Sequence, residues 1–403
     1  MAADCSVARP AFPLDAAYQH NLFDETARLR EAGPVHRVVT PDGEHAWLVT
    51  RYADVRAALA NPALSLSKAH AHAGYRGSSL PAALDEHLLN LDPPDHTRLR
   101  KLVGGTFTAR RIESLRDRIQ VTADALLDDL AGHDQIDLIE SYAAPLPMAV
   151  ICELLGVPPA DRADFRAWTH VLVDSAPDRR EVLRDALRNI LGFTRELIDQ
   201  KRARPGADLL SALTQARDVE DRLTENELLS ISFLLFAAGY ETSMNLIGVG
   251  VLELLRRPEL CAAVRSDPAL VQDFVEELLR HSSPASLSTR RFPVEDVEIG
   301  GVRIPAGEMV LLSLASANRD PARFSRPDEL LTDRPEQGHV AFGHGVHFCV
   351  GAPIARLEGR IAIGTVLRRF PSLALAVPTG QLPWRPSIRT RGLQRLPVSL
   401  GKE

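Results

Sequence analysis

A glycine-rich segment that ends in a cysteine is the part of the sequence best equipped for chemistry. Residues 341–353 read Ala-Phe-Gly-His-Gly-Val-His-Phe-Cys-Val-Gly-Ala-Pro, with the sulfur on Cys349. Glycines before the cysteine let the backbone fold tightly beneath the sulfur, so that several amide N–H groups can point at it. The amphipathic pattern that follows predicts a helix, whose N-terminus favours a thiolate over a thiol. Such a thiolate suits a haem iron.

This segment has two other interpretations. Cys349 can be an inert buried thiol in an ordinary glycine-containing loop. Alternatively, His344, His347 and Cys349 can bind a metal ion together, but they crowd into six residues with no fourth ligand nearby, which is unlike zinc spacing.

Paired basic residues occur in two further segments. His96 and Arg100 are four residues apart in a segment that Pro93 and Pro94 introduce, so they share one face of a helix and can clamp an anion. The alternative is a solvated helix surface. The second segment contains the adjacent arginines Arg290 and Arg291.

A long apolar helical pattern, residues 231–250, contains a glycine and a threonine at its middle. Gly239 costs about 1 kcal/mol relative to alanine inside a helix, and the Thr242 hydroxyl can bond the carbonyl of Ala238, four residues back. We expect the helix to be interrupted and locally widened here. The alternative is a packing glycine at a point where another helix crosses.

Residues 342–351 resemble the haem-binding loop of the cytochrome P450 superfamily, and supporting matches run in the right order from about Asp92 to the C-terminus. The resemblance is closest to soluble bacterial members that tailor natural products such as macrolides. It implies a triangular, mainly α fold with small β-sheets near the N-terminus and in the C-terminal half, haem b with Cys349 as axial iron ligand, and activation of O2. The cofactor contacts that it implies are His96, Arg100, Ala238, Gly239, Arg291, Phe342, Gly343, His347, Cys349 and Gly351. Arg290 is the nearest competitor for the role of Arg291.

The resemblance also assigns a catalytic pair and a structural pair. Glu241 and Thr242 would be the acid–alcohol pair, in which Thr242 hydrogen-bonds the oxygen being activated and Glu241 relays protons. Glu277 and Arg280 would form a buried structural network, although by spacing alone they are an ordinary surface ion pair.

The usual third partner of that network is an arginine, but residues 327–330 read Pro-Asp-Glu-Leu at the matching place. Arg334 and His339 both remain candidates for this part.

Helical periodicity dominates the chain, and we expect one domain over residues 1–403. Helices are predicted at residues 112–130, 161–173, 180–201, 224–255, 268–281 and 352–370. Strands are predicted at residues 35–39, 45–50, 290–293 and 309–314, with a hairpin at 297–308.

Composition indicates which partners and which cellular location to expect. The net charge of −6 argues against nucleic acid as a partner, and four scattered cysteines without a CxxC pair argue against a disulfide framework. No signal peptide pattern opens the chain, and no uninterrupted apolar run reaches the length of about 18 residues needed to span a bilayer. We expect a cytoplasmic monomer without membrane contact.

The predicted activity is that of a haem-thiolate monooxygenase that hydroxylates or epoxidises a sizeable, mostly apolar small molecule, such as a macrolide or polyketide of antibiotic biosynthesis. Substrate contacts are expected from the apolar face of residues 231–250 and from residues 62–92, 165–190, 284–289 and 388–389. No Gly-x-Gly-x-x-Gly follows a strand, so electrons from NAD(P)H must arrive through a ferredoxin and a ferredoxin reductase. The same oxidant can perform ring closure, aryl coupling or desaturation, and a haem-based ligand sensor is the non-enzymatic alternative.

Overall fold

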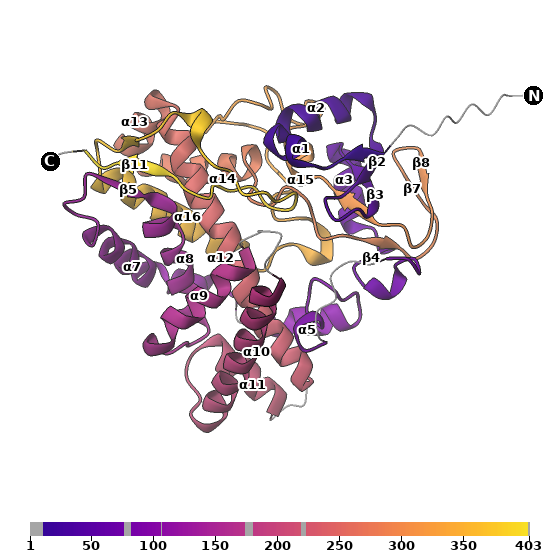
Figure 1. Cartoon of the computed structure of the whole chain (residues 1–403), viewed down its shortest axis with the longest axis horizontal. Helices are drawn as coiled ribbons and strands as arrows, with labels where there is room; N and C mark the ends of the chain where they lie inside the picture. Colours follow the sequence, from indigo (N-terminus) through magenta and orange to yellow (C-terminus); the bar gives the residue numbers. More distant parts are fainter. Residues whose placement is uncertain (1–10, 76–81, 106, 174–179, 219–222, 402–403) are drawn as a thin grey trace, which may run out of the picture.

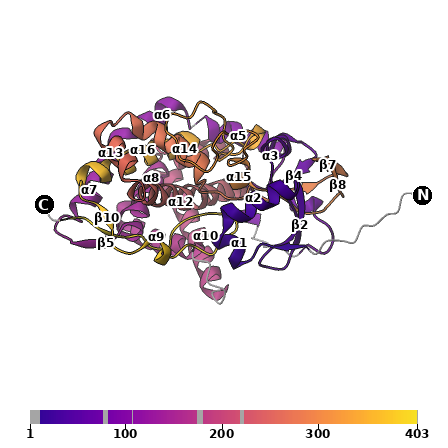
Figure 2. The same cartoon turned by 90° about the horizontal axis from the view of Figure 1, so that it is seen from above.

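A long central helix organises the computed structural model of the chain (Figure 1), which describes residues 11–75, 82–105, 107–173, 180–218 and 223–401. This helix, α12 (Glu225–Leu255), crosses the middle of the molecule (Figure 2). Its first turn is closed by a capping box: the Glu227 amide donates to Thr224 Oγ1 at 3.1 Å, and the Thr224 amide donates to Glu227 Oε2 at 2.8 Å.

The remaining helices cover α12 on several sides. It packs against α8, α10, α14 and α16, so a helix that is apolar around most of its circumference is buried. The longer helices are α2 (Leu22–Ala32), α3 (Tyr52–Ala60), α5 (Asp95–Gly104), α7 (Arg116–Asp128), α8 (Pro145–Leu154), α9 (Arg162–Val173), α10 (Arg180–Ala203), α11 (Leu209–Asp218), α13 (Pro258–Ser266), α14 (Leu270–His281) and α16 (Ala352–Arg369). Four short ones are α1 (Ala16–His20), α4 (Ala82–Asp85), α6 (Ala109–Glu113) and α15 (Leu314–Ala317).

By length and composition alone, α12 would also qualify as a membrane-spanning helix within the described part of the chain. However, 67% of its most apolar 18-residue window is buried inside the protein. That burial is what the core helix of a soluble protein shows.

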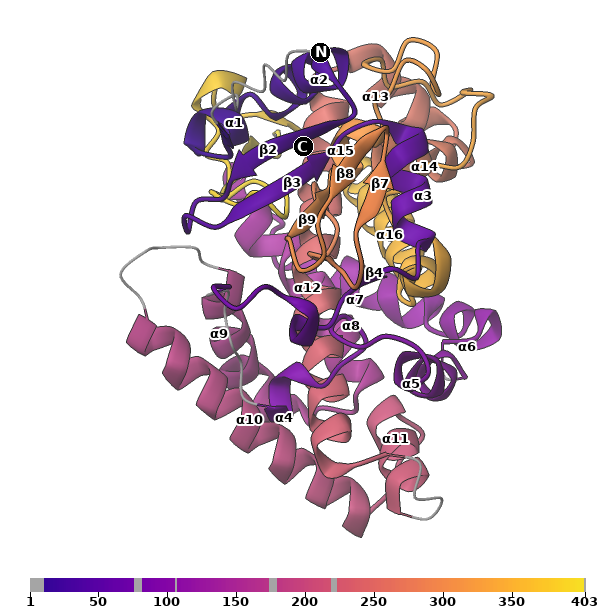
Figure 3. The same ribbon diagram turned by 90° about the vertical axis from the view of Figure 1, so that its right-hand side faces the viewer.

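Most of the small sheets lie to one side of the helices (Figure 3). The largest has the strand order β1 (Phe12–Pro13), β2 (Val35–Val39), β3 (His45–Val49) and β9 (Val310–Leu312). The β2–β3 pair is antiparallel and places Val35 opposite Val49, whereas β3 and β9 run parallel. The others are β10 (Ala374–Leu375) with β11 (Pro397–Ser399) and β5 (Gln135–Asp137), β4 (Leu64–Ser65) with β6 (Phe292–Pro293), and the hairpin of β7 (Val297–Ile299) and β8 (Val302–Ile304). Of these strands, β5 and β11 lie at the opposite end of the molecule (Figure 1).

Most of the predicted elements are confirmed, and two expectations are wrong. The single helix expected at residues 112–130 is divided into α6 and α7, because Ser114 donates its hydroxyl to the Arg111 carbonyl at 2.7 Å and so competes with the helical ladder. Strand β5 lies outside the two regions where strands were expected. It pairs with β11, more than 250 residues away, and such pairing leaves no local signal.

Candidate active site

The cysteine loop is shaped by two glycines in the left-handed region. Gly343 and Gly345 both have φ of +73°, where a side chain is strained. A Cβ on Gly345 would also lie 3.1 Å from Ala60 Cα, so the loop packs directly on α3. The Cys349 amide donates to the Phe342 carbonyl at 2.9 Å, which closes the loop just ahead of α16.

Cys349 lies two residues before Gly351, the N-cap of α16. Burial raises the pKa of the Cys349 thiol, while hydrogen bonds from the backbone of Gly351 and Ala352 and the charge of Arg100 act in the opposite direction. The surrounding groups therefore favour the thiolate, as the sequence predicts. In the protein alone, however, burial has the larger effect on the pKa of Cys349 and favours the thiol. A metal ion at the sulfur would reverse the balance, because a coordinating thiol is deprotonated.

A cavity opens at the Cys349 sulfur. Its wall is mostly apolar, and segments that are far apart in the sequence contribute to it. The predicted cofactor contacts on this wall are Arg100, Ala238, Gly239, Arg291, Phe342, Gly343, His347, Cys349 and Gly351, with Thr242 beside them.

Basic and imidazole groups converge at one side of this cavity. The rings of His96 and His347 are 4.0 Å apart between centroids, so His96 lies directly behind the cavity wall. The Nδ1 atom of each ring is buried and has no hydrogen-bond partner among the described residues. The same is true of Nε of Arg291. Burial lowers the pKa of His347 to about 3 and that of Arg291 to about 10. Each of these three side chains thus has a buried nitrogen that no described residue satisfies, as expected where an anion binds.

The acid nearest to this cluster is already engaged. Asp92 accepts hydrogen bonds from the Ser65 hydroxyl and from the Leu66 amide, the latter at 3.0 Å. Arg290, the competitor of Arg291, is absent from the described cavity wall. Its charge acts to lower the pKa of Tyr75, His87 and Arg389, and its own Nε and Nη2 are also buried without a hydrogen-bond partner among the described residues.

The middle of α12 forms the opposite wall. Thr242 Oγ1 donates to the Ala238 carbonyl at 3.0 Å, as the sequence predicts, but α12 is continuous here and the expected interruption is wrong. A Cβ on Gly239 would lie 3.2 Å from Ile151 Cδ1, so α8 approaches closely at this point. Packing thus accounts for the glycine without a break in the helix. Glu241 accepts a hydrogen bond of 2.7 Å from Thr390 Oγ1.

Comparisons with known proteins agree with this geometry. Residues 172–377 match the family model described as Cytochrome P450. The chain is 48% identical over 396 residues to Cytochrome P450 107B1 of Saccharopolyspora erythraea, covering 96% of this chain and 97% of the relative. It is 40% identical over 398 residues to the polyketide biosynthesis cytochrome P450 PksS of Bacillus subtilis, covering 97% and 98%. The solved structure of the P450 monooxygenase TamI with tirandamycin C superposes with a TM-score of 0.91 at 44% identity, covering 97% of this chain and all of that one.

The chain belongs to the cytochrome P450 family. It has the mainly α fold of that family and is a P450 monooxygenase, and the family uses haem iron and O2. The residues of this P450 fit the group: the Cys349 sulfur faces a mostly apolar cavity, and the unpartnered donors at its edge suit carboxylates.

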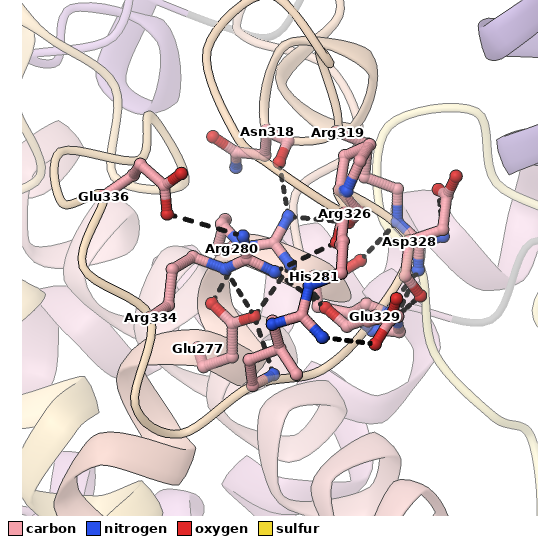
Figure 4. Close-up of polar contacts among 12 residues, drawn as sticks. Glu277, Arg280, His281, Asn318, Arg319, Arg326, Asp328, Glu329, Arg334 and Glu336 are labelled. Carbon is pink, nitrogen blue, oxygen red and sulfur yellow. Dashed lines mark hydrogen bonds and ion pairs between the residues drawn. The ribbon is translucent and has the colours of Figure 1, made fainter.

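A buried ion network supports the segment before the cysteine loop of this P450 (Figure 4). Arg280 donates to both carboxylate oxygens of Glu277 at 2.8 Å. Arg334 Nε donates to the same carboxylate at 2.9 Å, whereas His339 bonds Glu276 at 3.0 Å. Arg334 is therefore the third partner that the sequence left open.

Arg280 also ties the network to the main chain of a neighbouring loop. Its guanidinium donates to three backbone carbonyls, those of Asn318, Pro327 and Glu329, at 2.8–2.9 Å. One carboxylate cannot accept hydrogen bonds from all five N–H groups of a buried arginine, and the carbonyls accept from the groups that remain.

One buried acid on the cavity wall was missed. Glu358 of α16 is 4% exposed, and burial raises its pKa to about 7. The sequence did contain a signal for this residue, because Glu358 falls on the apolar face of the helix predicted at residues 352–370.

The segments expected to contact substrate are only partly on the cavity wall. Residues 62–92 contribute Leu66, Leu88 and Leu89, while residues 284–289 contribute five wall residues. Ile388 lines a second cavity instead. Residues 76–81 and 174–179 of the predicted segments lie outside the described part of the chain.

Proposed function

We propose that Cys349 is the axial ligand of haem b in this P450 and that residues 1–403 form one haem-enclosing domain. The observation that carries the proposal is the shared cavity: the only sulfur on its described wall and the unpartnered donors at its edge face the same space. His96, Arg100, Arg291 and His347 would hold the two propionates. Ala238, Gly239, Phe342, Gly343 and Gly351 would contact the flat faces of the ring.

Thr242 and Glu241 are the proposed catalytic pair. Haem, when bound, supplies the activation of dioxygen, and the protein must deliver protons to it. Thr242 stands on the cavity wall with a hydroxyl that now bonds the Ala238 carbonyl and can rotate to donate into the cavity. Glu241 directly precedes Thr242 in α12. It would hold a proton and pass it to Thr242 after Thr242 has given up its own.

The proposed substrate is a sizeable, mostly apolar secondary metabolite, such as a macrolide or another polyketide, which is hydroxylated or epoxidised. Leucine, isoleucine and valine side chains from several elements make up much of the wall, and few ionisable groups face it. The names of two relatives support this class, because PksS is a polyketide biosynthesis protein and TamI was solved with tirandamycin C.

Electrons would come from NAD(P)H through a ferredoxin reductase and a ferredoxin. The outer side of the cysteine loop offers a docking surface: Val346 is 56% exposed and Phe348 is 40% exposed, with Arg56 near His344. Apolar side chains beside arginines suit an acidic electron carrier. We infer a monomer located in the cytoplasm. The burial of α12 inside the protein supports only the part of this proposal that concerns the membrane, namely that this helix does not span one.

The visible spectrum tests the proposal. The reduced protein under carbon monoxide should show the strongly red-shifted Soret band of a thiolate-ligated haem, and Cys349→Ser should lose it. With NADPH, a plant-type ferredoxin and its reductase, a polyketide that shifts the haem spin state should gain one oxygen atom. A colourless protein, or a Soret band at the position of histidine-ligated haem, would refute the assignment.

A further inference from the structure

A second cavity lies behind the catalytic pair. It has a volume of about 300 Å³, enough for several water molecules, and Ser286, Ser387 and Thr390 are on its wall. The Ser286 hydroxyl oxygen is buried there and has no hydrogen-bond partner among the described residues, so a water molecule would satisfy it. Thr242 lines the haem cavity and Thr390 lines this one, which places Glu241 between the two spaces.

A short chain of hydroxyl groups connects the second cavity to Glu241. Ser387 Oγ lies 3.0 Å from Thr390 Oγ1, which in turn lies 2.7 Å from Glu241 Oε1. The backbone holds this turn against the haem cavity: Thr390 forms a β-bridge with Ala285, and the Arg389 carbonyl accepts from the Ser286 amide at 2.8 Å. The hydroxyl chain is thus built from residues in fixed positions.

When the Glu241 carboxylate is ionised, the hydroxyl hydrogens of this chain can be arranged in one continuous direction towards it. The Glu241 carboxylate accepts and cannot donate, so the single hydroxyl hydrogen of Thr390 goes to it. Ser387 must then donate to Thr390, and its oxygen accepts from the amides of Arg389 and Thr390 at 3.2 and 3.1 Å. Every hydroxyl hydrogen therefore points towards Glu241.

We propose that Ser387 and Thr390 are the entry segment of a proton relay that recharges Glu241 from water in the second cavity. This proposal rests on the proposed role of Glu241. A water molecule gives a proton to Ser387 Oγ, Ser387 passes its own hydrogen to Thr390 Oγ1, and Thr390 passes its hydrogen to Glu241 Oε1. Only O–H bonds break and form. The cavity water regains its proton from hydronium in the solvent, so the net result is one proton moved from the solvent to Glu241. Rotation of the two hydroxyls restores the chain.

The relay can be tested in the holoenzyme without any substrate. NADPH, a plant-type ferredoxin and its reductase drive O2 reduction, and peroxide released per O2 consumed measures how often proton delivery fails. Thr390→Val keeps the shape and removes the hydroxyl, so we expect its peroxide share to rise about three- to tenfold. Thr390→Ser is the matched control and should stay within about twofold of the parent protein. Ser387→Ala should change in the same direction as Thr390→Val.

A second readout follows the carboxylate itself. The infrared band that Glu241→Gln removes should shift in Thr390→Val and stay in place in Thr390→Ser, because only the valine variant loses the donor to Glu241. If Thr390→Val loses the red-shifted Soret band under carbon monoxide, its haem site is damaged and its peroxide share cannot be interpreted. The peroxide share of Ser387→Ala then tests the relay.

The outcomes separate the two proposals. If Glu241→Gln raises the peroxide share and neither Thr390→Val nor Ser387→Ala does, the relay is overturned and the proposed function stands. If Glu241→Gln leaves the share unchanged, the role of Glu241 fails and the relay fails with it.

Discussion

Arg334 Nε lies 2.9 Å from Glu277 Oε1, and this contact joins the loop before the cysteine segment to α14. Arg280 engages the same carboxylate from within α14. The side chains are nearly buried, with exposures of 2% for Arg280, 5% for Glu277 and 3% for Arg334. One carboxylate thus holds two arginines away from water, and removing either arginine leaves buried donors or acceptors unpaired.

Arg334→Ala should lower the free energy of unfolding by about 3–5 kcal/mol, because it breaks a buried ion pair and leaves Glu277 with one partner fewer. Urea unfolding of the holoenzyme, followed by the Soret band, measures the change. His339→Ala is the control: it removes the bond to Glu276 and should cost only about 1 kcal/mol. Equal costs for the two variants would contradict the choice of Arg334 as the third partner.

Arg291→Gln should weaken haem retention, because Arg291 has an unpartnered Nε at the edge of the haem cavity. We expect haem to dissociate at least about tenfold faster, in line with the loss of a charge-assisted hydrogen bond of about 1.5–3 kcal/mol. Transfer of haem to an excess of apomyoglobin measures the rate. Arg290→Gln should stay within about twofold, since the adjacent arginine is absent from the described wall. The reverse order would show that Arg290 holds the propionate.

Local chemistry predicted the parts of the site that are contiguous in sequence. The turn beneath Cys349 follows from glycines that accept positive φ, and the Thr242 bond to Ala238 follows from helical spacing. Pairings across the fold were not accessible in this way. The choice between Arg334 and His339 depends on how residues 325–339 wrap around α14, and the Thr390 bond to Glu241 joins residues 149 apart.

The glycines of α12 should differ sharply in their tolerance of a methyl group. Gly239→Ala brings a Cβ to 3.2 Å from the mobile end of Ile151, while alanine gains up to about 1 kcal/mol in helix propensity, so stability should change by less than about 1 kcal/mol. Gly250→Ala places its Cβ 2.6 Å from Ile363 Cδ1 and 2.8 Å from Leu278 Cδ2, on two sides at once. Overpacking should then cost about 1–3 kcal/mol. Thermal unfolding compares the two variants, and equal costs would contradict the packing.

The buried His281 should make the protein lose stability in mild acid. Its ring is 5% exposed, lies near the Arg319 guanidinium and bonds the Ser282 hydroxyl and the Asp328 carbonyl. Burial, reinforced by the charge of Arg319, lowers the pKa of His281 to about 2. In the unfolded chain a histidine titrates near 6.5, so below that pH the unfolded state binds a proton that the folded state refuses.

The sign and size of the effect follow from this difference. Stability is unaffected by His281 well above pH 6.5 and falls as the pH drops, by about 2 kcal/mol at about pH 5. His281→Asn removes the titrating group, so its loss of unfolding free energy between about pH 7.5 and about pH 5 should be smaller by about 2 kcal/mol. Urea unfolding of both proteins at both pH values measures the two losses. Titrating groups that both proteins contain contribute equally to each loss, so they cancel when one loss is subtracted from the other. Parallel losses in the two proteins would show that His281 takes up a proton in the folded state.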